Sequence, residues 1–132
     1  MKFSKLHGAG NDFILLMAEE IQGINRHDLA QKICDRHFGV GSDGMIVVDQ
    51  PEENLMADTR MSFYNADGTL GAMCGNGIRC FAKFVYDNGI ISTKEFLVQT
   101  GVGVLKVELL LEKCLINKVK VNLGIPVVTS KL

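Results

Sequence analysis

The sequence lacks a long apolar run, an excess of either charge and a cluster of prolines. Its apolar runs are short, such as residues 13–18, whereas a helix that spans a bilayer needs about 20 apolar residues. With 14 basic and 15 acidic residues the formal net charge is -1, which gives no field to attract nucleic acid or an anionic membrane. Residues 1–7 alternate polar and apolar side chains instead of forming a secretion signal, so we expect a cytoplasmic protein.

Cysteines are few and irregularly spaced. The four are Cys34, Cys74, Cys80 and Cys114. Without a secretion signal, this spacing predicts free thiols in a reducing compartment and no disulfide scaffold. A zinc site could be built from Cys34, His37, Cys74 and Cys80, but their C-x2-H and C-x5-C spacings lack the closely paired ligands of structural zinc sites. We therefore expect no metal site.

The remaining pattern is typical of one domain that is rich in strands. At 132 residues and 47% hydrophobic content, the chain has the length and apolar material of a single core, and its two prolines mark no linker. Strand-like runs cover residues 2–6, 13–17, 45–49, 60–64, 94–100, 102–111 and 115–123. In the last run, Val119 and Val121 alternate with lysines, which predicts a sheet with one solvated face.

Two segments predict helices. Asn25 can cap the first, which we expect over residues 26–37. The second begins after the Gly-Asn-Gly turn that precedes Ile78, and Phe81 and Val85 follow at helical spacing. Because this second helix is apolar on more than one side, we expect it to be buried. The predicted fold class is α+β, with a curled, mostly antiparallel sheet, a barrel-like roll, wrapped around a central helix.

The most informative segment places a thiol at the start of the second helix. Cys74 is followed by Gly75, Asn76 and Gly77. The amino terminus of a helix carries unpaired backbone amides and partial positive charge, so a cysteine there ionises more easily than a free one. The flanking glycines leave these amides open to a carboxylate. One turn of chain thus offers a base and a seat for an anion.

This pairing suits the removal of a proton from the α-carbon of an amino acid. That proton is weakly acidic, so its removal requires a base in contact with it and donors that stabilise charge on the adjoining carboxylate. A thiolate available near neutral pH is a suitable base. Inversion of the carbon also needs a second group on the opposite face, so Cys74 supplies half of such a site.

Four motifs together resemble the diaminopimelate epimerase family. They are F-S-K-L-H-G-A-G-N-D-F at residues 3–13, D-R-H-F-G-V-G-S-D-G at 35–44, N-A-D-G at 65–68 and M-C-G-N-G-I-R-C at 73–80. They occur in the family's order and spacing, and the likeness extends from Met1 to about Pro126. The resemblance implies an isomerase that interconverts LL- and meso-diaminopimelate without pyridoxal phosphate, metal or another cofactor, in lysine and peptidoglycan synthesis.

The resemblance also implies a set of site residues. Cys74 takes the place of the family's first catalytic cysteine. Gly75 and Asn76 take the place of the turn that holds the substrate carboxylate. Asn11 and Asn65 fall where the family has substrate-binding amides.

By the same resemblance, a second half is missing. Family members are longer and consist of two similar α+β halves that each supply one cysteine. Residues 1–126 correspond to the amino-terminal half-domain, and residues 127–132 to the start of the second half or a tail. The chain fits a natural short protein, a subunit of a split enzyme or a piece of a longer reading frame. We expect it to be inactive alone, and to associate with a complementary carboxy-terminal half or with itself.

Several of these residues also have ordinary structural interpretations. The alternative for Cys74 is a buried thiol that fills space, and its glycine neighbours argue against that. We expect the other three cysteines to lie in the core. Asn11 and Asn65 are also good turn residues. The Asp-Gly pair at residues 67–68 predicts a hairpin turn.

Other functions stay open. The missing half favours an inactive truncated half-domain or a small amino-acid binding module. The runner-up enzyme is an isomerase of the same structural class, such as a proline racemase-like or phenazine-biosynthesis-like protein. The G-x-G-x-x-G run at residues 39–44 follows a predicted helix and precedes a strand, the reverse of the dinucleotide-binding order, so we discount nucleotide binding. The expected partner is a small-molecule substrate, diaminopimelate, and neither nucleic acid nor a membrane.

Overall fold

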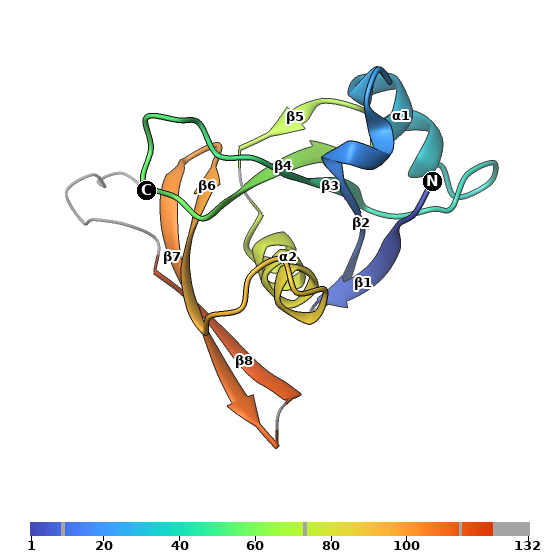
Figure 1. Ribbon diagram of the computed structural model, residues 1–132. Helices are drawn as coiled ribbons and strands as arrows, with labels where there is room; N and C mark the ends of the chain where they lie inside the picture. The colour runs from blue at the N-terminus through green and yellow to red at the C-terminus, as the bar shows by residue number, and fades with distance from the viewer. Residues whose placement is uncertain (9, 73, 114, 123–132) are drawn as a thin grey trace.

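A curled sheet encloses one helix in the computed structural model (Figure 1). The structure describes residues 1–8, 10–72, 74–113 and 115–122. The strands are Ser4–Gly8 (β1), Asn11–Met17 (β2), Gly44–Asp49 (β3), Thr59–Asn65 (β4), Leu70–Gly71 (β5), Glu95–Thr100 (β6), Gly103–Glu112 (β7) and Leu115–Asn122 (β8). They lie in the order β1-β2-β3-β4-β6-β7-β8, with β5 paired to β4. Each predicted strand is confirmed to within two residues at either end, apart from position 123, which lies outside the described residues.

Within the described residues the sheet is mixed, with five antiparallel and two parallel pairs of strands. The parallel pairs are β2 with β3 and β4 with β6. Each of these connections contains a helix, as a parallel crossover requires. The helices are α1 (Arg26–Ile33) and α2 (Gly75–Asp87), and a short 3-10 turn, η1 (Ala18–Ile21), follows β2. The predicted mostly antiparallel α+β sheet is therefore confirmed. None of the helices in the described part of the chain has the length and hydrophobicity that crossing a bilayer requires.

α2 is the central helix that the sequence predicted. Ile78, Phe81 and Val85 are all 0% exposed, and they pack against the inner face of the curled sheet. The helix ends where expected: Asn88 is the C-cap residue, and Gly89 follows with a φ of 73°. Burial of this many apolar side chains, rather than helix propensity, stabilises α2.

β2 and β3 are buried on both faces, which explains why their sequences are continuous apolar runs. Successive side chains alternate between two cores. Those in the inner core around α2 are Phe13, Leu15, Ile46 and Val48. Those in the outer core beneath α1 and η1 are Ile14, Leu16, Met45 and Val47. The two strands are thus fixed from both sides, and so are the residues at their ends.

α1 is shorter than the predicted span of 26–37. Asn25 caps it as expected, because its side chain accepts a hydrogen bond from Asp28 N at 3.0 Å. The helix ends at Ile33 because Asp35 turns the chain: its Oδ1 accepts hydrogen bonds from His37 N at 2.7 Å and from Phe38 N at 3.0 Å. Such side-chain bonds to the backbone compete with helix continuation. Cys34 onward therefore belongs to the loop that leads to β3.

Candidate functional site

Cys74 occupies the N-cap position of α2. Its backbone is extended, with φ -135° and ψ 122°, and its carbonyl oxygen accepts the first helical hydrogen bond from Ile78 N at 2.9 Å. Its side chain makes no capping hydrogen bond, is partly exposed and touches the edge of the inner core. The thiol therefore lies at the mouth of the helix, in contact with both the core and solvent.

The first turn of α2 stays open around this thiol. A Cβ added to Gly77 would lie 3.3 Å from Cys74 Cβ and 3.3 Å from Ile46 Cδ1, so any side chain there would press on the cysteine. A Cβ on Gly75 would meet no atom within 4 Å. Among the residues that the structure describes, none accepts a hydrogen bond from the backbone N–H of residues 75–77, as expected for a first turn. The helix start thus presents unpaired donors beside a sulfur atom.

Asn11 and Asn76 meet directly, although they are far apart in the sequence. Asn76 Nδ2 donates a hydrogen bond to Asn11 Oδ1 at 2.7 Å. β1 approaches the helix closely at the same place, since a Cβ on Gly8 would lie 3.3 Å from Asn76 O and 3.1 Å from Cys80 Sγ. The start of β2 and the start of α2 are therefore joined at one end of the molecule. Three of the five predicted site residues, Cys74, Gly75 and Asn76, are consecutive there, and Asn11 is bonded to Asn76.

Asn65 lies at the same end of the sheet but in a different environment. It ends β4, where it pairs with Gly44 of β3. Its Nδ2 donates to Thr69 O at 3.3 Å and to Thr69 Oγ1 at 3.1 Å, so its amide nitrogen stabilises the hairpin that follows. Gly68, with φ 92°, closes that predicted hairpin between β4 and β5. Asn65 is thus a turn residue, and no residue that the structure describes is bonded to its side-chain oxygen.

Two other cysteines are core residues, as predicted. Cys34 is 3% exposed and Cys80 is 4% exposed. Burial raises the pKa of the Cys34 thiol, and the hydrogen bond from Ser42 offsets part of that rise. Burial, and secondly the neighbouring Cys74, raise the pKa of the Cys80 thiol. Cys114 lies outside the described residues. Within the described residues, no group of three His, Cys, Asp or Glu side chains gathers as metal ligands would.

A charged cluster that was not predicted from the sequence lies behind Asn11. Arg36 Nη2 donates to Asp12 Oδ1 at 2.9 Å and to Asp43 Oδ1 at 3.0 Å. Asn11 Nδ2 donates to Asp43 Oδ2 at 3.2 Å, which connects the cluster to the site. These residues stand inside the motifs at residues 3–13 and 35–44, but no sequence pattern indicates that they meet.

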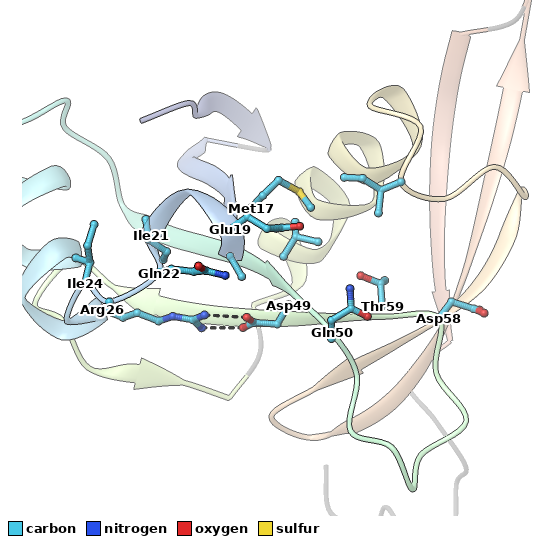
Figure 2. A pocket seen from close by; sticks show the side chains of 14 residues that line it. Met17, Glu19, Ile21, Gln22, Ile24, Arg26, Asp49, Gln50, Asp58 and Thr59 are labelled. Carbon is cyan, nitrogen blue, oxygen red and sulfur yellow. Dashed lines mark hydrogen bonds and ion pairs between the residues drawn. The ribbon is translucent and has the colours of Figure 1, made fainter.

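A cavity of about 500 Å³ lies at the opposite end of the sheet (Figure 2). Its lining includes the last residues of β2 and β3 and the first residue of β4. β2 runs from Asn11 to Met17 between the two ends, which separates them by roughly 20 Å. Figure 2 shows Arg26 reaching Asp49 in the wall of this cavity, with Nη1 and Nη2 each 2.8 Å from a carboxylate oxygen. The cavity is therefore distinct from the surroundings of Cys74.

A family model described as diaminopimelate epimerase matches residues 3–129. The chain belongs to the diaminopimelate epimerase family. One relative in this family, the diaminopimelate epimerase of Caldanaerobacter subterraneus subsp. tengcongensis, is 48% identical over 130 residues, which make up 98% of this chain and 46% of that protein. The chain spans about half the length of the curated relatives that it matches. The resemblance inferred from the four motifs is confirmed.

Solved structures share the fold of this family member. A hydroxyproline epimerase from Agrobacterium vitis superposes with a TM-score of 0.69, covering 90% of this chain and 40% of that chain at 15% identity. A Bacillus anthracis phenazine biosynthesis protein superposes with a TM-score of 0.62, covering 84% of this chain and 35% of that chain at 18% identity. At such identities the likeness concerns the fold alone. It confirms the predicted curled sheet around a central helix.

Proposed function

We propose that this chain is the amino-terminal half-domain of an enzyme that inverts an α-carbon of diaminopimelate, and that Cys74 is one of its two proton-transferring thiols. The observation that carries the proposal is a partly exposed thiol at the N-cap of α2, beside backbone amides to which no described residue is bonded. Residues 1–126 form this half in the proposal. Residues 123–132, which include the expected second-half segment 127–132, lie outside the described residues.

In the proposed reaction the substrate carboxylate binds the amides of Gly75 and Asn76. The thiolate of Cys74 takes the α-proton, so a C–H bond breaks, an S–H bond forms and the electron pair spreads onto the carboxylate that these amides stabilise. A second thiol, supplied by a complementary half, returns a proton to the opposite face of the carbon. Asn11 and Asn65 contact the substrate, and Asn65 does so through Oδ1, which suits an ammonium group.

Labelling with an aziridine analogue of diaminopimelate tests the assignment of Cys74. Peptide mass spectrometry should find one analogue on Cys74 and none on the buried Cys34 or Cys80. Cys74→Ser is the control that should abolish labelling without disturbing the fold, because its side chain makes no hydrogen bond that stabilises the helix. Equal labelling of Cys34, Cys74 and Cys80, or an unlabelled Cys74, would contradict the proposal.

Turnover is tested by supplying a carboxy-terminal half. The carboxy-terminal half of the Caldanaerobacter relative, mixed with or fused to this chain, should support exchange of the α-hydrogen of diaminopimelate with deuterium oxide. Neither half alone should invert the α-carbon, because inversion needs groups on both faces of the carbon. Cys74→Ala in the joined protein should remove the inversion, since one face of the carbon then lacks its thiol. Inversion that survives this substitution would exclude Cys74 as one of the two bases.

Binding without turnover is the second candidate function. The chain covers 46% of the length of two curated relatives, and the second catalytic group of the proposed reaction would lie outside the part that it covers. Calorimetry with diaminopimelate, with proline as the control ligand, separates the candidates. Heat with diaminopimelate but no hydrogen exchange in the joined protein indicates a binding module. No heat with either ligand indicates an inactive half-domain, and heat with proline alone favours the runner-up substrate class.

An apolar surface near Cys74 supports the proposal of a protein partner. Leu70 is 68% exposed and Val102 is 57% exposed. They flank the junction at which Gly101 N donates to Ala72 O at 2.8 Å, two residues before Cys74. We propose that this surface meets the complementary half or a second copy of the chain. Light scattering should then show self-association of the chain alone, and a monomer at high concentration would count against it. Cytoplasmic location and a role in lysine biosynthesis belong to the same proposal.

A further inference from the structure

A continuous chain of side-chain hydrogen bonds runs from the start of α2 to the loop after α1. Asn76 Nδ2 donates to Asn11 Oδ1 at 2.7 Å, and Asn11 Nδ2 donates to Asp43 Oδ2 at 3.2 Å. A carboxylate only accepts hydrogen bonds, so Asp43 determines which end of the Asn11 amide faces it. The oxygen of Asn11 must then face Asn76. Asp43 thereby fixes the orientation of an amide that contacts the proposed carboxylate seat.

Asp43 is itself held by a second carboxylate and an arginine. Arg36 reaches both acids through Nη2, at 3.0 Å from Asp43 Oδ1 and 2.9 Å from Asp12 Oδ1, and its Nη1 lies 3.2 Å from Asp12 Oδ2. The backbones of the two aspartates cross-link them further: Asp12 N donates to Asp43 Oδ2 and Asp43 N to Asp12 Oδ1, each at 3.0 Å. Lys5 Nζ lies 3.4 Å from Asp12 Oδ2. Among the described side chains, the Arg36 guanidinium is the one that contacts both carboxylates.

The electrostatics of the cluster require that cation. The Asp12 side chain is only 11% exposed and lies beside a second acid, a setting in which like charges repel. The hydrogen bond from Arg36, ahead of the bonds from Asp43 N and Lys5, holds the pKa of Asp12 well below its usual range despite partial burial. Arg36 is planar and can bridge two carboxylates at once, which a lysine ammonium does less well.

We propose that Arg36 is a positioning residue that orients Asn11 and Asn76 at the start of α2 by bridging Asp12 and Asp43. The functional consequence rests on the proposed function. Because Asn76 Nδ2 is bonded to Asn11, the first turn of α2 keeps one fixed shape toward a substrate carboxylate. Arg36 touches neither the thiol nor the seat, and it acts only through the two aspartates. This relay, the chain of bonds from Arg36 through Asp12 and Asp43 to Asn11 and Asn76, sets how tightly the ligand is held. It does not change the intrinsic reactivity of Cys74.

The relay itself is tested without ligand by the side-chain amide NMR signals of Asn11 and Asn76. In the wild-type chain these hydrogens should exchange slowly with water, because each amide has a bonded partner. Arg36→Met should speed their exchange at least about tenfold, the effect of losing one charge-assisted hydrogen bond. Arg26→Met, which removes the matched arginine at the other end of the sheet, should leave them unchanged. Unchanged signals in Arg36→Met would overturn the proposal.

Protection of Cys74 from iodoacetamide by diaminopimelate tests the consequence. The half-protecting concentration should rise about tenfold in Arg36→Met, while the alkylation rate without ligand stays within about twofold and Cys34 and Cys80 stay unmodified. Arg36→Lys keeps the charge and should give an intermediate rise in the half-protecting concentration. This second variant keeps the test decisive if Arg36→Met folds poorly. Equal protection in all variants would overturn the proposal. No protection in the wild type, together with slow amide exchange that Arg36→Met speeds, would overturn the proposed function and support the relay.

Discussion

The two ends of the sheet carry the same ion pair in two settings. At the end near Cys74, Arg36 binds Asp12 through both terminal nitrogens, at 3.2 and 2.9 Å. At the cavity end, Arg26 binds Asp49 in the same manner, with both distances 2.8 Å. The Arg36 side chain is 54% exposed and that of Arg26 only 29%. The distances differ little, so what each carboxylate contacts besides its arginine must distinguish the two pairs.

Those further contacts are of different kinds. Asp49 accepts a hydrogen bond from Ser62 of β4, so its pair fastens the start of α1 to two neighbouring strands. Asp12 is cross-linked to Asp43, whose carboxylate orients Asn11. The cavity-end pair therefore joins elements of the fold, whereas the pair near Cys74 orients an amide at the proposed site. The geometry of an ion pair alone does not reveal its role.

The largest expected effect comes from the loop that carries Arg36 and Asp43. A Cβ on Gly39 would overlap the carbonyl oxygen of Lys32 at the end of α1. Gly39→Ala should therefore lower the free energy of unfolding by about 3 kcal/mol. Gly23→Ala, in the lining of the far cavity, has open space and a φ of 79°, so it should cost only about 1 kcal/mol of backbone strain. Urea denaturation measures both. Equal losses would contradict the close packing of this loop.

Removing a carboxylate at the cavity end should have the next largest effect. Asp49→Asn leaves Arg26 with a neutral partner inside a largely buried contact, because the Asp49 side chain is 15% exposed. We expect a loss of about 2 kcal/mol in the free energy of unfolding. The rate at which iodoacetamide modifies Cys74 should stay the same in this variant, since the pair lies at the opposite end of the sheet. A changed rate would mean that the two ends are coupled.

Much of the fold could be predicted because its signals are local. The helical spacing of Ile78, Phe81 and Val85 determines the central helix, and the apolar runs of β2 and β3 indicate strands buried on both faces. The position of Cys74 at a helix start follows from three neighbouring residues, so it was predictable too. Two elements left no such signal: β5 has only two residues and η1 only four. The early end of α1 depends on one carboxylate, Asp35, which turns back on the backbone.

The relay behind the site could not be predicted, because its contacts are not local. Asp12 lies 24 residues from Arg36 and 31 from Asp43. They meet only because β2 and β3 are parallel and start side by side, with Phe13 opposite Gly44. The sequence predicts a mostly antiparallel sheet and contains no signal for that parallel register. The family resemblance indicates that Asn11 contacts the substrate, but only the fold shows which residues hold its side chain.

The loss of stability in acid should distinguish Asp12 from Asp49, by a smaller amount than the losses predicted above. Arg36 holds the folded pKa of Asp12 well below its usual range, so the unfolded chain binds a proton below about pH 4 that the folded chain does not. This contribution is complete above that pH and is lost as the pH falls toward the folded pKa. Asp12→Asn should thus flatten the fall of unfolding free energy by up to about 1.4 kcal/mol per pH unit in acid.

The matched variant Asp49→Asn should flatten that fall less. Burial raises the pKa of Asp49, and the hydrogen bonds from Arg26 and Ser62 outweigh this, leaving a net lowering. The two effects oppose each other, so the folded and unfolded states differ less in the number of protons that they bind in acid. Urea unfolding at a series of acid pH values measures both slopes. A steeper change in Asp49→Asn than in Asp12→Asn would reverse the order of the two pairs.

The smallest effect is expected from an ion pair to which no further described side chain is bonded. Lys83 Nζ lies 2.6 Å from Asp87 Oδ2, one turn apart on α2, and the side chains are 51% and 46% exposed. Water screens both charges, so a double-mutant cycle with Lys83→Met and Asp87→Asn should give a coupling of no more than about 0.5 kcal/mol. Added salt should reduce it further. The Lys83–Asp87 pair is the reference for the Arg26–Asp49 and Arg36–Asp12 pairs. A coupling as large as that between Arg26 and Asp49 would show that the distance between the charges sets the contribution of each pair, and not burial together with further partners.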